Sequence, residues 1–250
     1  MVTGERRSNA RLACKLEKIT RQVMPGKLVV FEGVEGCGKS TQLKRLQAAL
    51  QESDRLLQLQ QQGVLPQVLT TREPGGTELG LGLRQLLLGY QGAAPMVSRA
   101  ELLLYAADRA QHVEEVIRPA LAAGSWVLCD RYIDSTVAYQ GYGRGLDLAL
   151  IDQLNQVATG GLVPDLTLWL RLDAAAGLAR TRQRGAADRM EQADLAFHQR
   201  VQGGFEALAQ QHPGRIVAID AAANADTVAA EVFAVVSRYL EQWYAPSLMA

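Results

Sequence analysis

The chain has 250 residues, of which 48% are hydrophobic, and 26 Lys and Arg residues balance 26 Asp and Glu residues. This length supports a sizeable core and favours one large α/β domain over two small ones. A net charge of zero disfavours a protein that works on nucleic acid or on an acidic membrane surface, because both need surplus positive charge. The sequence also lacks an apolar run of membrane-spanning length and a secretory signal, so we expect a cytoplasmic protein.

Residues 1–24 are polar and basic and show weak hydrophobic periodicity. We interpret them as an N-terminal extension that is disordered or forms a short helix, or that reflects start-site choice, since Met24 would make a natural beginning. Residues 25–250 are expected to form a single domain, because no linker or internal repeat divides them.

The first predicted strand, Leu28–Phe31, is apolar and β-branched, and it runs directly into a glycine-rich loop. Gly33–Ser40 match G-x-x-x-x-G-K-[ST], the pattern of a P-loop, whose backbone N–H groups cradle phosphates. Lys39 would lie along the β- and γ-phosphates, and Ser40 would hold Mg²⁺. The alternative, an ordinary glycine turn before a helix, does not explain four fixed positions directly after a strand. The predicted nucleotide-binding residues are Gly33, Val34, Glu35, Gly36, Cys37, Gly38, Lys39, Ser40 and Thr41.

Strand and helix patterns then alternate along the chain. A helix carries apolar residues from Leu43 through Leu50 into the following leucines, and Gln58–Gln62 is interpreted as a surface extension. The later strands are predicted at 67–71, 126–129, 166–172 and 216–219, and the later helices at 78–88, 99–123, 146–158, 174–184, 195–210 and 226–243. This alternation predicts a three-layer α/β fold, with a five-stranded parallel sheet and helices on both faces.

Asp130 and Arg131 follow the predicted strand at 126–129, where open parallel sheets bind their ligands. Asp130 is placed to hold Mg²⁺ directly or through water, and the alternative is a strand-end cap. The planar guanidinium of Arg131 suits a phosphate, and the alternative is a surface salt bridge. Further along, Arg180, Arg182, Arg184 and Arg189 form a basic run, which by itself is most often a solvated helix and loop.

Four stretches stand in order: the P-loop, TREPGGT at 71–77, DRYIDSTVAYQGYGRG at 130–145 and RTRQRGAADRMEQ at 180–192. Together they resemble the thymidylate kinase family, and the resemblance covers about 27–243. It implies a P-loop NTPase fold, ATP as donor, Mg²⁺, dTMP as acceptor, dTDP as product and a homodimer. The apolar helix faces at Leu102–Tyr105 and Leu150–Val157 are our suggestion for the surfaces that pair.

The resemblance also implies roles for single residues. Arg131 grips the dTMP phosphate, Glu73 and Arg84 lie near the acceptor sugar and phosphate, and Arg109 reaches the thymine carbonyl groups. Ser135, Thr136, Tyr139 and Gln140 line the nucleoside pocket on a short helix, and Tyr139 crowds the 2′ position. Without the family, Arg109 would be interpreted as a surface arginine and Tyr139 equally well as a core residue.

A lid at about 180–192 completes the catalytic set that the resemblance implies. The variable P-loop positions hold no arginine, so the lid must supply the one that stabilises the transferring phosphoryl group, and we expect Arg184 or Arg182. Glu35 is expected to face the acceptor sugar and to orient these arginines. The expected catalytic residues are Lys39, Arg184, Arg182, Asp130 and Glu35. Two other functions stay open: another deoxynucleoside or nucleoside monophosphate kinase, and a non-catalytic nucleotide-binding switch.

Overall fold

The computed structural model describes residues 25–65, 67–183 and 188–248. The N-terminal extension 1–24 and Arg184 lie outside the described residues, so the statements made about them from the sequence stay predictions. Within the described part of the chain, no helix is both long and apolar enough to cross a bilayer.

Five parallel strands form the centre of the molecule and confirm the predicted sheet. They are β1 (Leu28–Glu32), β2 (Val68–Arg72), β3 (Trp126–Asp130), β4 (Leu166–Arg171) and β5 (Ile216–Asp220), in the order β2-β3-β1-β4-β5. The connections after β1 and β3 therefore leave in opposite directions across the sheet. A crevice forms at the carboxyl ends of two such strands, and this is where open parallel sheets bind ligands.

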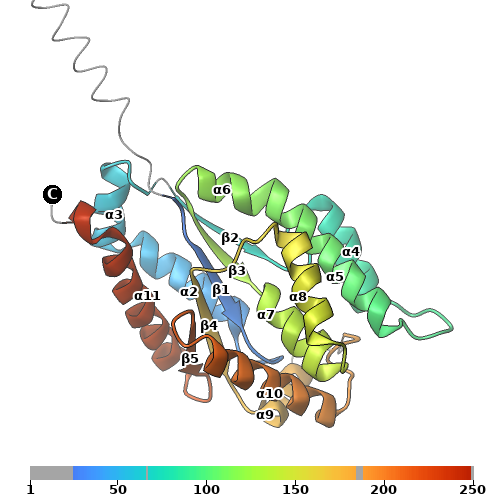
Figure 1. Cartoon of the computed structure of the whole chain (residues 1–250). Coiled ribbons are helices and arrows are strands. Elements are labelled where there is room, and N and C mark those ends of the chain that lie inside the picture. The colour runs from blue at the N-terminus through green and yellow to red at the C-terminus, as the bar shows by residue number, and fades with distance from the viewer. Residues whose placement is uncertain (1–24, 66, 184–187, 249–250) are drawn as a thin grey trace, which may run out of the picture.

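Side chains of β1 alternate between the two faces of the sheet, and each face is covered by helices. Val29 and Phe31 pack in one cluster with leucines of α2 (Lys39–Gln51) and valines of α11 (Ala225–Leu248). Val30 packs in the other with Val113 and Ile117. Figure 1 shows α2 and α11 on one side of the sheet and α4 (Glu78–Gly89), α5 (Ser98–His112), α6 (Arg118–Ala122) and α8 (Leu148–Thr159) on the other. The predicted three-layer arrangement is confirmed.

The segment after α2 differs from the prediction. The helix ends at Gln51, and a separate helix α3 (Asp54–Gln61) follows, with Ser53 in extended conformation before it and Asp54 in its first turn. Leu56 and Leu59 are fully buried. The expectation that Gln58–Gln62 is only a surface extension was therefore incomplete, because Leu59 within this stretch is part of the core.

Two predicted helices contain a π-helical turn, which widens the helix by one residue per turn. The predicted helix 99–123 consists of α5, a π-helical turn at Val113–Ile117, and α6. The short helix after Arg131 consists of α7 (Ile133–Thr136) and a π-helical turn at Val137–Gly143. Two further helices, α9 (Ala174–Arg182) and α10 (Leu195–Gln211), complete the fold.

Candidate active site

The loop between β1 and α2 has the backbone geometry of a phosphate cradle. Gly36 and Gly38 have φ angles of 73° and 96°, which residues with a Cβ rarely adopt. Lys39 is buried, and its amine donates to the carbonyl oxygens of Gly33 and Val34 at 3.1 and 3.0 Å. The loop carbonyls thus turn toward Lys39. A pocket at this loop is lined by Gly36, Gly38, Lys39, Ser40 and Thr41.

Helix α9 is docked directly on this loop through two glycines. A Cβ built on Gly36 would clash with the carbonyl oxygen of Gly177, and a Cβ built on Gly177 would clash with the carbonyl oxygen of Glu35. Only glycine lets the two backbones approach this closely. The first turn of α9, which leads into the predicted lid segment at 180–192, is therefore fixed relative to the loop.

Asp130 and Ser40 meet at the mouth of the loop. The Ser40 hydroxyl donates to Asp130 Oδ2 at 2.7 Å, although the two residues are 90 positions apart in the sequence. One hydroxyl and one carboxylate form the oxygen set by which Mg²⁺ is held when phosphate and water supply its remaining ligands. Within the described residues there is no cluster of three or more His, Cys, Asp or Glu side chains suited to a metal. The residues present fit Mg²⁺ bound together with a phosphate ligand.

Arg131 occupies the crevice between β1 and β3, in an unusual backbone conformation with φ of 73°. Its guanidinium donates to Glu35 Oε1 at 2.6 Å, to the carbonyl of Gly33 at 3.2 Å, and to Ser135 and Tyr139 at 3.1 Å each. Its side chain is only 15% exposed. The pair with Glu35 is therefore not a solvent-exposed salt bridge, and it lies between the loop and the neighbouring pocket.

Glu35 is strongly acidic despite its burial. Burial alone would raise its pKa, but the charges of Arg131 and Lys39 and the hydrogen bond from Tyr139 lower the pKa to about 2. The carboxylate is thus ionised at neutral pH and neutralises part of the positive charge of the site. In this structure Glu35 contacts Arg131 and Tyr139. Among the described residues it forms no hydrogen bond or ion pair with the lid arginines that it was expected to orient.

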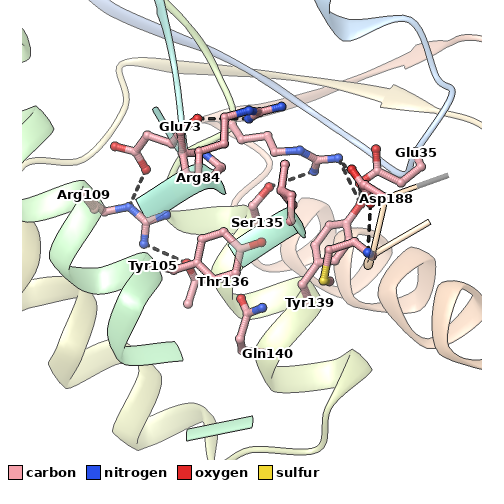
Figure 2. Close-up of a pocket in the computed structure, with 14 residues that line it drawn as sticks. Glu35, Glu73, Arg84, Tyr105, Arg109, Ser135, Thr136, Tyr139, Gln140 and Asp188 are labelled. Atoms are coloured by element: carbon pink, nitrogen blue, oxygen red, sulfur yellow. Dashed lines mark hydrogen bonds and ion pairs between the residues drawn. The ribbon is translucent and has the colours of Figure 1, made fainter. Parts of the chain in front are cut away.

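A second pocket lies beside the loop, and Figure 2 shows its side chains converging from α4, α5 and the segment after β3. All eight residues expected to contact the acceptor line it: Glu73, Arg84, Arg109, Arg131, Ser135, Thr136, Tyr139 and Gln140. The structure thus brings together residues that are up to 67 positions apart in the sequence.

Arg109 forms the buried back wall of this pocket. Four of its five N–H groups donate to protein acceptors: Nε to Glu73, Nη1 to Thr136 and Asn155, and one N–H of Nη2 to the carbonyl of Tyr132, at 2.7–3.0 Å. The remaining N–H has no acceptor among the described residues. Arg109 can therefore offer at most one hydrogen bond to a ligand unless these contacts change.

Glu73 is held from both sides. It accepts from Arg109 at 2.8 Å, and its second oxygen contacts His112 Nδ1 at 2.9 Å. His112 Nε2 in turn contacts Thr71 Oγ1 at 2.6 Å. Glu73 is only 4% exposed, so this chain of contacts, rather than solvent, orients its carboxylate.

The lid arginines are placed differently from one another. Arg182 is exposed at the end of α9 and has no hydrogen bond within the described ranges, whereas Arg180 donates to the carbonyl of Ala221 at 3.1 Å. Arg189 is bound to the body of the protein, donating to Glu101 at 2.6 Å and to the carbonyl of Leu87 at 2.7 Å. Arg184 lies outside the described residues.

Comparison with known proteins identifies the family of the chain. The family model described as thymidylate kinase matches residues 31–232. The chain belongs to the thymidylate kinase family. A thymidylate kinase of a Cyanothece species is 57% identical to this chain, and the match covers 88% of this chain and 97% of the relative. A thymidylate kinase of Trichodesmium erythraeum is 52% identical, and the match covers 88% of this chain and 99% of the relative. The crystal structure of the Ehrlichia chaffeensis thymidylate kinase has a TM-score of 0.67, with 35% identity, and covers 85% of this chain and all of its own.

For this member of the thymidylate kinase family, the structure adds pocket residues that the sequence did not reveal. Tyr105 lines the second pocket one helical turn before Arg109, a spacing of four that would have placed both on one face. Asp188 and Arg72 also line the site, Asp188 in both pockets and Arg72 at the carboxyl end of β2. Both lie within stretches that carry the family resemblance, 71–77 and 180–192, but neither residue was assigned a role from them.

Proposed function

We propose that this thymidylate kinase family member transfers the γ-phosphate of ATP to dTMP, giving dTDP and ADP. The observation that carries the proposal is the adjacency of the two pockets. Five side chains border both of them: Glu35, Glu73, Arg84, Arg131 and Asp188. A phosphate donor in the loop and a nucleotide acceptor in the neighbouring pocket would therefore meet at this common border, as in-line transfer requires.

On the donor side, the backbone N–H groups of the loop and the amine of Lys39 bind the phosphates of ATP. The positive end of α2 adds to this attraction, because the helix begins at Lys39. Ser40 and Asp130 would hold Mg²⁺, which would neutralise phosphate charge when bound.

On the acceptor side, Arg131 and Arg84 bind the phosphate of dTMP. Thr136, Gln140 and the free N–H of Arg109 face the base, and Tyr139 limits the space beside the sugar. The attacking phosphate oxygen needs no side-chain base, because it is already largely ionised at neutral pH.

The lid arginines stabilise the charge that spreads over the phosphoryl oxygens during transfer. Arg182 or Arg184 takes this role, since Arg180 and Arg189 already donate to other groups of the protein. Closure of the lid over the site also excludes water, which would otherwise hydrolyse ATP. A homodimer and a cytoplasmic location stay predictions.

An acceptor panel tests the proposal. Purified protein with Mg²⁺ and ATP is assayed for ADP formation with dTMP, dUMP, dCMP, AMP and thymidine. We expect the largest kcat/KM for dTMP, and little ADP formation without an acceptor. Preferred use of another monophosphate would support the alternative kinase assignment, and ATP binding without transfer to any acceptor would support a nucleotide-binding switch.

A further inference from the structure

A buried carboxylate outside the expected site connects the acceptor pocket with the lid. Glu101 lies in the first turn of α5 and is 1% exposed. It accepts hydrogen bonds from Gln140 Nε2 at 2.8 Å, from Arg189 Nη1 at 2.6 Å, and from Arg144 Nε and Nη2 at 3.3 and 3.2 Å.

Glu101 acts only as an acceptor in this setting. Burial alone would raise its pKa, but the hydrogen bond from Gln140 and the charges of Arg144 and Arg189 outweigh this effect and lower the pKa. An ionised carboxylate has no proton to donate. Each group that faces Glu101 must therefore present a donor.

This requirement fixes the orientation of the Gln140 amide. A glutamine amide has a donor end and an acceptor end, and an unconstrained amide can present either end to a ligand. Because the NH₂ group of Gln140 donates to Glu101, the carbonyl oxygen Oε1 is on the other side. Among the described residues, no protein donor lies within hydrogen-bond distance of Oε1, and Gln140 lines the acceptor pocket beside Tyr105 and Thr136 (Figure 2).

We propose that Glu101 is a positioning residue for base selection, which holds the Gln140 carbonyl oxygen toward the acceptor base. The inference rests on the proposed function and names the chemistry that the pocket recognises. A base with a ring N–H at this point, as in the imide of thymine or uracil, is accepted. A base with a lone pair there, as at N3 of cytosine, faces an acceptor and is rejected.

The energetic basis is the cost of opposing two acceptors in a closed pocket. A buried polar group that meets a mismatched partner makes no hydrogen bond, yet its removal from water still costs free energy. Sites built around a specific hydrogen bond discriminate far more strongly than apolar pockets that merely measure size. Fixing the amide before binding preserves this discrimination, because a freely rotating amide would turn its NH₂ toward cytosine.

The variant Glu101→Gln tests the inference. Arg144 and Arg189 would still need an acceptor, so the new amide would turn its oxygen toward them and its NH₂ toward residue 140. Gln140 would then rotate and present its own NH₂ to the base. We expect kcat/KM to fall for dTMP and to rise for dCMP, so that the dTMP to dCMP ratio falls by about tenfold or more. The dTMP to dUMP ratio should not change, because both bases carry the imide.

A matched control is available on the surface. Glu115 also accepts from a glutamine amide, that of Gln111, at 2.7 Å, but both residues are exposed and outside both pockets. Glu115→Gln should leave both substrate ratios unchanged. The ratio of two substrates on one preparation does not depend on how much of the protein is folded, so a destabilised Glu101→Gln preparation stays informative.

The variant Gln140→Leu tests the inference independently if Glu101→Gln yields no active protein. Removing the amide should lower the dTMP to dCMP ratio, and adding Glu101→Gln to it should change this ratio no further. An unchanged ratio in Gln140→Leu, or in Glu101→Gln, would overturn the inference. Wild-type turnover of dTMP is measured alongside; its absence would contradict the proposed function, whereas turnover with unaltered ratios would contradict only the role of Glu101.

Discussion

The site contains charged side chains that are oriented by other protein groups. Arg131 illustrates this: its guanidinium is bound by Glu35, Ser135, Tyr139 and the carbonyl of Gly33, and its backbone N–H donates to the carbonyl of Phe31 at 3.0 Å. These contacts stabilise a backbone conformation that is unfavourable for arginine. A phosphate bound there would find the guanidinium already in place, so little side-chain entropy remains to be lost on binding.

Arg131→Ala should therefore impair the use of dTMP more than the use of ATP. Loss of charge-assisted hydrogen bonds worth about 2–3 kcal/mol would lower kcat/KM for dTMP roughly 30- to 150-fold. Steady-state kinetics with each substrate varied in turn provides the measurement. Arg45→Ala is the matched control, since Arg45 also forms an ion pair, with Asp226 at 2.6 Å, but is 40% exposed. Equal losses for ATP and dTMP would contradict the assigned role.

Glu32 is linked to the same arginine through Ser135, whose hydroxyl donates to Glu32 and accepts from Arg131. It ends β1 and accepts from the backbone N–H groups of Tyr132 and Ser135 at 2.8 and 3.0 Å, and so caps α7, whose own N-cap side chain makes no such bond. Burial and the charge of Asp134 raise the pKa of Glu32 to about 7. The Glu32 carboxyl therefore binds a proton more tightly in the folded protein than in the unfolded chain. The stability that this protonation contributes is lost as the pH rises from about 4.5 through 7.

Glu32→Gln should remove this pH dependence. The stability of the wild type relative to the variant should decline by roughly 2–3 kcal/mol between pH 5 and pH 8. Urea unfolding of both proteins across this range measures the difference. Parallel stability curves would show that Glu32 does not titrate in this window.

At the scale of elements, the junction between the P-loop and α9 determines where the lid begins. Gly177→Ala should push α9 away from Glu35, because the added methyl group has no room. We expect a lower kcat and a higher KM for ATP. Gly203→Ala in α10 is the matched control, since the same change there meets no atom within 4 Å and should stabilise the helix by up to about 1 kcal/mol. Equal activity of the two variants would contradict a role for this junction.

The elements differ in how well their sequences predict them. The P-loop and the strand ends at Asp130 and Arg131 could be located because each depends on a short local pattern. The π-helical turns and the division between α2 and α3 depend on packing against distant segments. Glu101 is 39 positions from Gln140 and 88 from Arg189, so no window of sequence brings the three together. Glu101, which acts through such long-range contacts, was therefore missed, whereas Tyr105 was missed despite its local spacing from Arg109.

At the scale of the whole molecule, apolar side chains gather on the outside of one helical layer. Leu79 on α4, Leu103 on α5 and Val157 on α8 are 55%, 56% and 81% exposed, and these helices pack side by side. Leu102, by contrast, is buried, so the face suggested from the sequence begins at its neighbour. Exposed apolar side chains on neighbouring helices are typical of an interaction surface.

We therefore expect a dimer of about twice the mass of the chain in light scattering coupled to size-exclusion chromatography. The double variant Leu103→Glu and Val157→Glu should elute as a monomer, because charges placed in an apolar interface are costly to bury. Leu57→Glu is the control, since Leu57 is 39% exposed on α3, which packs against α2 and α11. A wild type that is monomeric at all concentrations would contradict the expectation.

The common border of the two pockets has a thermodynamic consequence. Each substrate that binds will alter the charges and contacts of residues that its co-substrate also touches, so the two affinities are linked. Linkage requires that ATP change the affinity for dTMP by the same factor by which dTMP changes the affinity for ATP. Calorimetric titration of either nucleotide, with a non-hydrolysable ATP analogue as the donor, would yield the same coupling constant in both orders of addition. Substitution of Arg84 or Arg131, the two cations on this border, should change that constant most.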